Sequence, residues 1–438
     1  MSFRPRPTFN AGLKLAVESA DGTAPEKVVN PSYFQGGKWF DVTTDELPTL
    51  QMQNTIIFPG GRAGKRTINN RAPVPGRQWV EGGFGFPVDF ATMMPLTYAT
   101  LGSVESEAVQ STNFTLLSGG SLAGGGSVNV TLTSQPSDGG AILRFNVTGT
   151  STPGTFTVTG VDSYGEPATE SVSYTSAGSI YTRTSFSSVA SVVAESDGNA
   201  NVDVNGFQYW QHTFRFNNAS APTLSAEVYG DPSTGTAAST FMYTGLANQE
   251  LTLTNPAEQT DGLFTGNATF QGNPNATCAA GVLNSVSPVR VIPAWTQEIS
   301  RDGGSYCQVT NFGMTFNAGG RKYFTACGTK RPQGSFWGGA ELTGSLDILI
   351  DNDAEYNRWL GASAQSIVSK WTSPWKLTST QNQQMSASIN AAYFENIDRV
   401  DNNEMYQLSA DFRAIPDAVD GILAIRYINN IPGEAIAV

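Results

Sequence analysis

The chain contains few of the residues on which most enzyme and metal chemistry depends. Its 438 residues include one histidine, His212, and three cysteines, Cys278, Cys307 and Cys327. The cysteines lack the spacing of zinc sites, and a nucleophile paired with histidine would have to use His212. That histidine stands in the alternating run Trp210–Phe214, where a place on a strand face explains it. The sequence therefore predicts no catalytic residue, no metal site, no cofactor and no enzymatic activity.

Charge is also scarce, because only 14% of the residues are Asp, Glu, Lys or Arg, and the net charge is −12. A surface with little charge suits burial against other copies of the same chain, since charged groups are costly to desolvate. The acidic balance argues against a nucleic-acid binder, which needs basic patches to replace counterions on phosphate. It is compatible with a surface past which DNA slides without adhering, because like charges repel.

Long apolar runs are absent as well. No segment approaches the roughly 20 apolar residues of a membrane span, and the first 22 residues hold no apolar stretch of the kind found in signal peptides. We therefore expect a soluble protein made in a cytoplasm, with free thiols. A single disulfide between Cys307 and Cys327 stays open.

Two segments resemble ligand-binding loops and fail in detail. In Gly60–Arg66, Pro59 stands where a phosphate loop needs its first glycine, and Arg66 stands where serine or threonine must bind magnesium. In Asp351–Glu355, the calcium-loop pattern breaks at Tyr356, where glycine is required. A basic turn and an acidic helix cap explain these segments better.

The most informative feature that is present is an internal echo. Gly60-Gly61-Arg62 matches Gly319-Gly320-Arg321 in an ungapped register that continues toward the C-terminus. Further matches in this register are Pro73 with Pro332, Gly85 with Gly344, and Leu101-Gly102 with Leu360-Gly361. With 46 glycines in the chain, some such matches also arise by chance. Two copies of one β-rich unit favour a protein that builds rings.

Both copies read as a strand followed by a short helix. In the first, residues 79–90 form a strand, Thr92 caps a helix with Pro95 in its first turn, and Gly102 ends it. In the second, Leu342–Ile350 alternates as a half-buried strand, and Asp351–Asp353 caps a helix that Gly361 ends.

A segment of different character separates the copies. Residues 105–207 hold short alternating strands between turn signals, which is typical of an immunoglobulin-like β-sandwich. The predicted fold is mainly β, with two β-sandwich or barrel domains, each with a short flanking helix, and one inserted sandwich. The expected organisation is residues 1–50 as an N-terminal arm and loop, 51–104 with 208–298 as the first domain, 105–207 as the insert, and 299–438 as the second domain with a C-terminal arm.

Several motifs after the insert resemble one family. They are Gly230-Asp231, Tyr243-Thr244-Gly245-Leu246, Leu251-Thr252-Leu253-Thr254-Asn255 and Asp261-Gly262-Leu263-Phe264-Thr265-Gly266. In this order they resemble the second half of the major tail tube proteins of long-tailed bacteriophages. In the second copy, the stretch Gly344–Ile348 with its capped helix resembles the outward hairpin and helix of that family, and the insert resembles the Ig-like decorations of many phage tail proteins.

The resemblance implies a structural virion protein of the tail, assembled in the host cytoplasm. Inner strands of neighbouring subunits would pair edge to edge into a barrel around a channel with an acidic lumen for double-stranded DNA. Two fused copies imply rings of three chains with pseudo-sixfold symmetry, which stack into a tube. The N-terminal arm (1–41), the loop 60–77 and the tail 429–438 are the expected contacts between rings. Tape measure, tail terminator and distal tail proteins are the implied partners.

Two alternatives remain open at this stage. The chain could be another virion component, such as a decoration or receptor-binding tail protein, whose insert binds sugar through exposed Tyr164, Tyr174 and Tyr181. It could also be a β-rich hydrolase that uses paired carboxylates, because the geometry of such a pair is spatial and leaves no sequence pattern.

Overall fold

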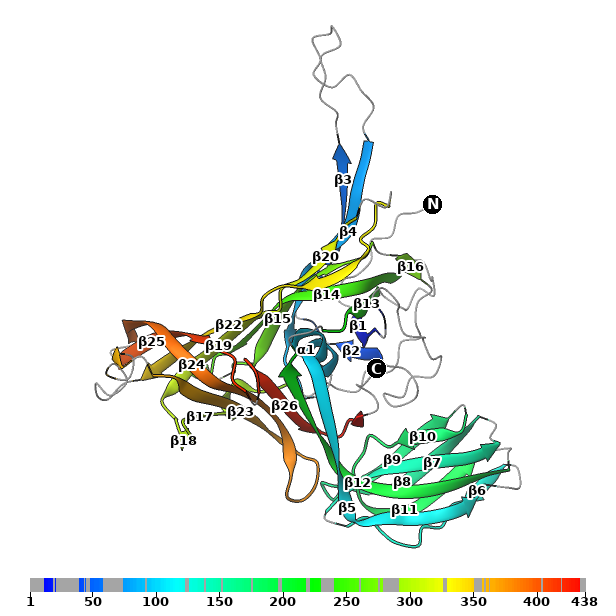
Figure 1. Cartoon of the computed structure of the whole chain (residues 1–438). Helices are drawn as coiled ribbons and strands as arrows, with labels where there is room; N and C mark the ends of the chain where they lie inside the picture. Colours follow the sequence, from blue (N-terminus) through cyan, green and yellow to red (C-terminus); the bar gives the residue numbers. More distant parts are fainter. Residues whose placement is uncertain are drawn as a thin grey trace, which may run out of the picture.

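The computed structural model of the chain has a mainly β fold, as the sequence predicts (Figure 1). It describes residues 12–18, 20, 39–42, 44, 48–57, 74–90, 93–122, 126–137, 139–150, 153–174, 176–195, 199–217, 221–229, 240–259, 261–274, 276–278, 291–325, 329–349, 357, 360–361, 363–402, 405–418 and 420–433. Within these ranges, no helix is long and apolar enough to cross a membrane.

The first strand set joins segments from the N-terminus and from beyond the predicted insert. Its antiparallel order is β1-β13-β14-β15-β4-β3. The strands are β1 Gly12–Val17, β3 Gln51–Ile57, β4 Val74–Pro87, β13 Leu224–Tyr229, β14 Thr240–Asn255 and β15 Thr265–Gly272. Two short strands, β2 Trp39–Val42 and β16 Ala276–Cys278, extend its margins by pairing with β1 and β14. The outer part of the β3–β4 hairpin projects away from the rest of the molecule (Figure 1).

A second strand set, built from the last third of the chain, has the matching order. Its antiparallel order is β17-β23-β24-β25-β22-β19. The strands are β17 Gln297–Arg301, β19 Val309–Asn317, β22 Glu341–Leu349, β23 Gln365–Lys376, β24 Asn382–Asn402 and β25 Met405–Ala414. Each strand also has the same place along the chain as its counterpart in the first set. The second set adds β18 Gly304–Ser305, the hairpin of β20 Gly320–Tyr323 and β21 Gly334–Trp337, and β26 Ala424–Asn429.

The helix that follows β4 in the first set and the one that follows β22 in the second end alike. Helix α1, Met94–Leu101, ends at Gly102, which adopts the left-handed φ of 89° and donates its backbone N–H to the carbonyl oxygen of Tyr98. Gly361 donates its N–H to the carbonyl oxygen of Asn357, 3.1 Å away, in the same place of the second set. The predicted stop at Gly102 is confirmed. The predicted cap is wrong, because Met93 occupies the N-cap position without a side-chain bond, and Asp351–Asp353 lie outside the described residues.

Residues between the first-set strands form a two-sheet sandwich. One sheet has the order β6-β11-β8-β9, and the other consists of β10, β7 and the far halves of β12 and β5. The strands are β5 Gly102–Ser121, β6 Ser127–Asn129, β7 Ile142–Thr150, β8 Gly154–Asp162, β9 Pro167–Tyr174, β10 Gly178–Tyr181, β11 Phe186–Glu195 and β12 Asn199–Phe216. Phe145 and Phe156 stack between the sheets with ring centroids 4.5 Å apart.

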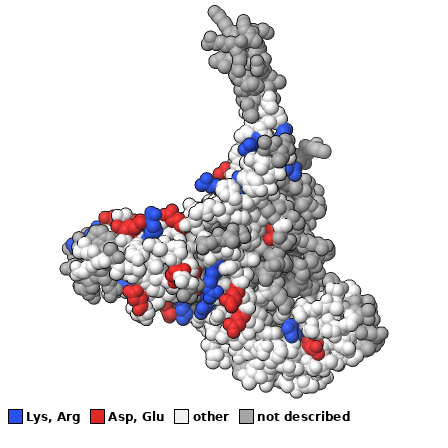
Figure 2. All heavy atoms as spheres, in the orientation of Figure 1, with Lys and Arg blue, Asp and Glu red and all other residues white. Residues whose placement is uncertain are grey.

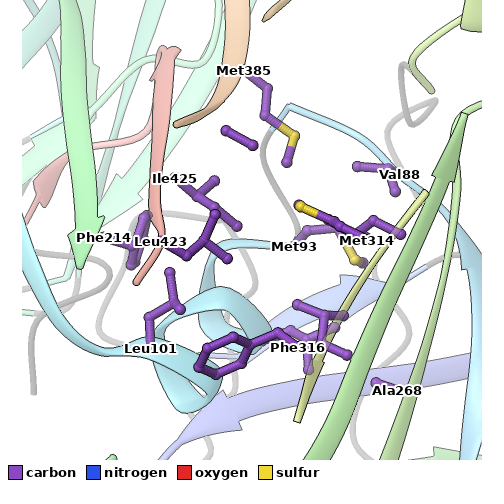
Figure 3. Packing of buried hydrophobic residues seen from close by; sticks show 14 of the residues in the cluster. Val88, Met93, Leu101, Phe214, Ala268, Met314, Phe316, Met385, Leu423 and Ile425 are labelled. Carbon is purple, nitrogen blue, oxygen red and sulfur yellow. The ribbon is translucent and has the colours of Figure 1, made fainter. Parts of the chain in front are cut away.

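The sandwich has its own core, whereas the two strand sets share one. Buried side chains from Leu116 to Val204 form the sandwich cluster. A separate cluster runs from Leu13 to Ile431 and includes both sets and α1. Figure 3 shows this shared core, with Met93 and Leu101 near α1 facing side chains of β19, β24 and β26. The strand sets therefore fold against each other instead of forming two separate cores.

Several boundaries differ from the predicted organisation. Leu13 and Leu15 in β1 are fully buried, so residues 12–17 are a core strand instead of an arm. Asn429 and Ile431 are buried as well, so the chain from 429 to 431 packs on its own molecule. The insert boundaries at 105 and 207 fall within β5 and β12, which pair, with β-bulges, from Gly102–Phe216 to Ser121–Asn201. β17 crosses the boundary placed at 299.

Candidate assembly surfaces

The two strand sets meet edge to edge inside one chain. β14 of the first set pairs antiparallel with β19 of the second, from Glu250 opposite Asn317 to Asn255 opposite Phe312. Thr252 and Thr315 also join their hydroxyl groups across the junction at 3.1 Å. The exposed edge of one set is thereby closed by the other, which removes an aggregation hazard from the middle of the molecule.

The same kind of edge is left at the far end of the second set. In β24, β25 pairs with one side of residues 392–402, and β23 occupies the other side only as far as Ala392. In the part of the chain that the structure describes, no strand pairs with that side of β24 beyond Ala392. In the first set, β14 is the strand that corresponds to β24, and the matching side of β14 pairs with β19.

A matching edge lies at the beginning of the first set. Among the described residues, β3 pairs only with β4, and Thr49 continues this pairing by donating its N–H to the carbonyl oxygen of Gly83 at 2.8 Å. By position in the set, the segment around Thr49 corresponds to β19, because Gly83 corresponds to Leu342, the partner of Phe316. The described sheet thus has two unpaired edges, one at β24 and one at the segment around Thr49. They correspond to β14 and β19, the two strands that pair at the internal junction.

The registers specify how these edges would meet. With Gly85 matched to Gly344, the ladders place Leu251 in correspondence with Tyr393, and Phe316 with Thr49. Leu251 lies opposite Phe316 within the chain. The corresponding pair between two chains is Tyr393 with Thr49. Pro48 beside it lacks an N–H group, so the ladder between chains has one donor fewer.

Charged side chains gather next to the β24 edge. Arg413 on β25 pairs with Glu341 at 2.9 Å and with Glu395 at 2.8 Å. Figure 2 shows acidic and basic side chains over this outer end of the second set, and an almost uncharged face on the sandwich. Charges beside a free edge limit unspecific pairing while leaving a specific partner possible.

His212 occupies a structural position. It is fully buried, with Nε2 2.9 Å from the carbonyl oxygen of Ile431 and Nδ1 2.9 Å from Oγ of Ser106. Burial lowers the pKa of His212 to about 4, and the bond to Ile431 opposes this only in part. A neutral histidine held by two hydrogen bonds in a strand agrees with the place on a strand face that the sequence predicts.

In the residues that the structure describes, no group of three His, Cys, Asp or Glu side chains could hold a metal ion.

The other residues considered from sequence have mixed outcomes. Tyr174 and Tyr181 are buried, so the expectation that they are exposed for sugar binding is wrong, and of the three tyrosines only Tyr164 is exposed. Cys307 is an exposed free thiol, and Cys327, its possible disulfide partner, lies outside the described residues. The segments 60–66 and 351–356 also lie outside them.

A scan against protein-family models found no model that matches the chain, and a search of curated proteins found none that is similar.

Proposed function

We propose that this protein is a structural component that assembles by pairing the β24 edge of one chain with the β3 edge of the next. The observation that carries the proposal is the β14–β19 junction, where two sets with one strand order already meet edge to edge. Because the two strand sets already make this contact once within the chain, it is the simplest template for a contact between chains. The matching edges at the two ends of the sheet supply its partners.

Such a contact is head to tail, because each chain offers a different edge to each neighbour. Heterologous contacts close into a ring when the rotation per unit divides a full turn. We infer rings of three chains, in which six strand sets have nearly equivalent places. Stacked rings of this kind would form the tube of a long-tailed bacteriophage, and the chain would be its major tail tube protein, located in the virion tail and assembled in the host cytoplasm.

Electrostatics support a conduit for DNA. The net charge of −12 would keep the walls of such a tube from binding the phosphate backbone that passes through it. The proposal needs no catalytic residue and no cofactor. The implied partners are further copies of this chain, a tape measure protein, and the proteins that end the tube at its two extremities.

The sandwich is, in this proposal, an Ig-like decoration on the outside of the tube. Its separate core and its two-strand stem of β5 and β12 support this place, because a module with its own core can be carried without entering the tube wall. The alternative of a decoration or receptor-binding protein has lost part of its basis, since two of its three proposed sugar-binding tyrosines are buried.

Electron microscopy of the concentrated protein tests the proposal. We expect rings and short tubes that carry knobs on the outside. A second preparation would replace residues 108–210 with an Asn-Gly turn that joins the paired positions Glu107 and Gln211. Tubes of this variant should have a smooth outer surface. Protein that stays monomeric at every concentration would contradict the proposal, and loss of host attachment without any tubes would favour the alternative.

A further inference from the structure

A groove with cationic and aromatic walls lies at the base of the projecting hairpin. The β3–β4 and β20–β21 hairpins lie side by side there, and the backbone N–H of Gln78 donates to the carbonyl oxygen of Lys330 at 2.9 Å. The lining side chains include Pro75, Arg77, Trp79, Phe324 and Lys330. Figure 2 shows lysine and arginine side chains gathered around this hairpin base.

The groove is arranged to receive an aromatic group with negative charge around it. The guanidinium carbon of Arg77 lies 4.6 Å from the ring centroid of Phe324, and Trp79 contacts the same ring edge-on at 6.1 Å. Among the described residues that line the groove, two are cations and none carries a carboxylate. Such walls favour an occupant that is both aromatic and acidic.

An exposed aromatic side chain with acidic residues near it, Trp295, lies at the opposite end of the first strand set. We call Trp295 and its helical turn the knob. Trp295 is 65% exposed, the highest value among the large apolar side chains that the structure describes. Its helical turn, η4 (Ala294–Thr296), is held by the bond from the Ala294 N–H to the Gly262 carbonyl oxygen at 2.9 Å. Leu263 beside it, in a β-bridge with Pro293, is 41% exposed.

Carboxylates flank the knob as the groove requires. Glu258, Asp261 and Glu298 are exposed residues of the segments around Trp295. Lys370 pairs with Glu298 at 3.6 Å, so Asp261 is the carboxylate that we assign to the contact with the groove. Because the groove carries Arg77 and Lys330, the two surfaces are complementary in charge as well as in apolar character.

The knob and the groove face opposite ways along the same strands. In β4, Trp79 lies by the groove, and Pro87 pairs with Thr265 near the knob. Eight residues of strand separate Trp79 from Pro87, a distance of about 26 Å. A second copy displaced along the strand direction would therefore bring its knob to the groove of the first. Edge pairing cannot supply this contact, because it runs across the strands.

We propose that Trp295 of one copy docks into the groove between Trp79, Phe324 and Arg77 of the next copy along the strand axis. This inference rests on the proposed function, in which edge pairing forms a ring, and it assigns the contact that stacks one ring on another. The occupant is a second copy of this chain. The contact repeats without closing, so it builds a filament of rings.

Two variants of the full chain test the docking. Trp295→Ala removes the knob, and Arg77→Glu reverses the charge of the groove, while Tyr164→Ala removes another exposed aromatic side chain, on the sandwich, as the control. Both test variants should keep the wild-type melting curve and still form rings. The protein concentration needed for tubes, measured by sedimentation and electron microscopy, should rise at least about tenfold for both and stay unchanged for the control.

A charge exchange gives the inference its sharpest test. Arg77→Glu combined with Asp261→Arg should recover tube formation that either single change weakens, because each new charge meets its opposite on the neighbouring copy. Tubes that form from Trp295→Ala as readily as from wild type, or a double variant no better than Arg77→Glu, would overturn this inference alone. Wild-type protein that never forms rings would overturn the proposed function together with it.

Discussion

The ring nitrogen Nε2 of His212 lies 2.9 Å from the carbonyl oxygen of Ile431, close to the end of the chain. A carbonyl oxygen can only accept, so Nε2 carries the proton and Nδ1 accepts from the hydroxyl of Ser106. This arrangement holds the neutral imidazole and ties β12, the stem of the sandwich, to the segment after β26. Asn429, at the end of β26, donates its side-chain amide to the carbonyl oxygen of Phe90 at 2.7 Å, which ties the same end of the chain to the segment before α1.

The first prediction is a loss of stability in mild acid. An unfolded histidine titrates near pH 6.5, whereas burial lowers the pKa of His212 in the folded chain to about 4. Between these values the unfolded chain binds one proton more than the folded chain. The free energy of unfolding should therefore fall as the pH decreases from about 6.5 to 4, by about 3 kcal/mol in total.

Carboxylates titrate in part of the same range, so the measurement is a difference. Urea unfolding of wild type and His212→Gln at pH 7 and at pH 4 separates the two contributions. The variant should be less stable at pH 7 and should lose about 3 kcal/mol less than wild type on acidification. Parallel pH profiles of the two proteins would show that His212 does not titrate as described.

The second prediction concerns the buried contact of Trp371 with Phe264 and Asn255, which joins the two strand sets. Trp371 on β23 stacks on Phe264 with ring centroids 4.2 Å apart, and its Nε1 donates to Oδ1 of Asn255 at 3.2 Å. Trp371→Ala should cost about 3–5 kcal/mol, because a large buried ring leaves a cavity. Trp371→Phe keeps an aromatic ring against Phe264 and should cost about 1–3 kcal/mol, since Asn255 loses a donor. A Trp371→Phe variant as stable as wild type in urea unfolding would mean that this hydrogen bond contributes nothing, and equal costs of the two variants would mean that the stacked ring contributes nothing.

The third prediction uses a glycine of the sequence echo. A Cβ added at Gly344 would meet the ring of Phe412 and the backbone oxygen of Gly313, both too close for any real contact. Gly344→Ala should therefore destabilise the protein by about 1–3 kcal/mol. Gly339→Ala is the matched control, because nothing lies within 4 Å of that position. A thermal shift that is the same for both variants would contradict the packing at Gly344.

Strands of the shared core can be predicted from the sequence where apolar and polar residues alternate regularly. Leu342, Leu346 and Ile348 indicate β22, and all three are buried. β1 was missed although Leu13, Leu15 and Val17 alternate in the same way, because the prolines and glycines around them favoured an arm. β1 pairs with β2 and, on its other side, with β13 about 210 residues later, and the local sequence does not indicate that distant pairing.

The assembly edges show a second limit of sequence reasoning. The echo placed Gly85 in correspondence with Gly344, and the ladders agree, because these residues lie opposite Asn267 of β15 and Phe412 of β25. Which edges stay open depends on how β14 and β19 meet, a contact between segments about 60 residues apart. The Trp295 knob also needed the structure, since one tryptophan among 8 shows its exposure only after folding.

The fourth prediction is a disulfide between neighbouring chains. Thr49 donates its N–H toward β4, so at the outer edge it would form a non-hydrogen-bonded pair with Tyr393 of the next copy, with Cα atoms about 4.5 Å apart. A cysteine pair at that distance can be oxidised. Under mild oxidation, Thr49→Cys combined with Tyr393→Cys should give covalent multimers on a denaturing gel. The control, Thr49→Cys with Ile415→Cys, places one thiol on the other side of β24, beside Ala391, and should give no more multimers than wild type, whose Cys307 is exposed.

The number of chains in one ring tests the central claim most directly. Averaged end-on images of rings or tubes, together with the native mass of one ring, give that number. The proposal that two fused strand sets replace two subunits of a sixfold ring predicts three chains, six similar strand sets around the axis, and three sandwiches on the outside. A ring of six chains, or an interface in which the β24 edge faces solvent, would contradict the account.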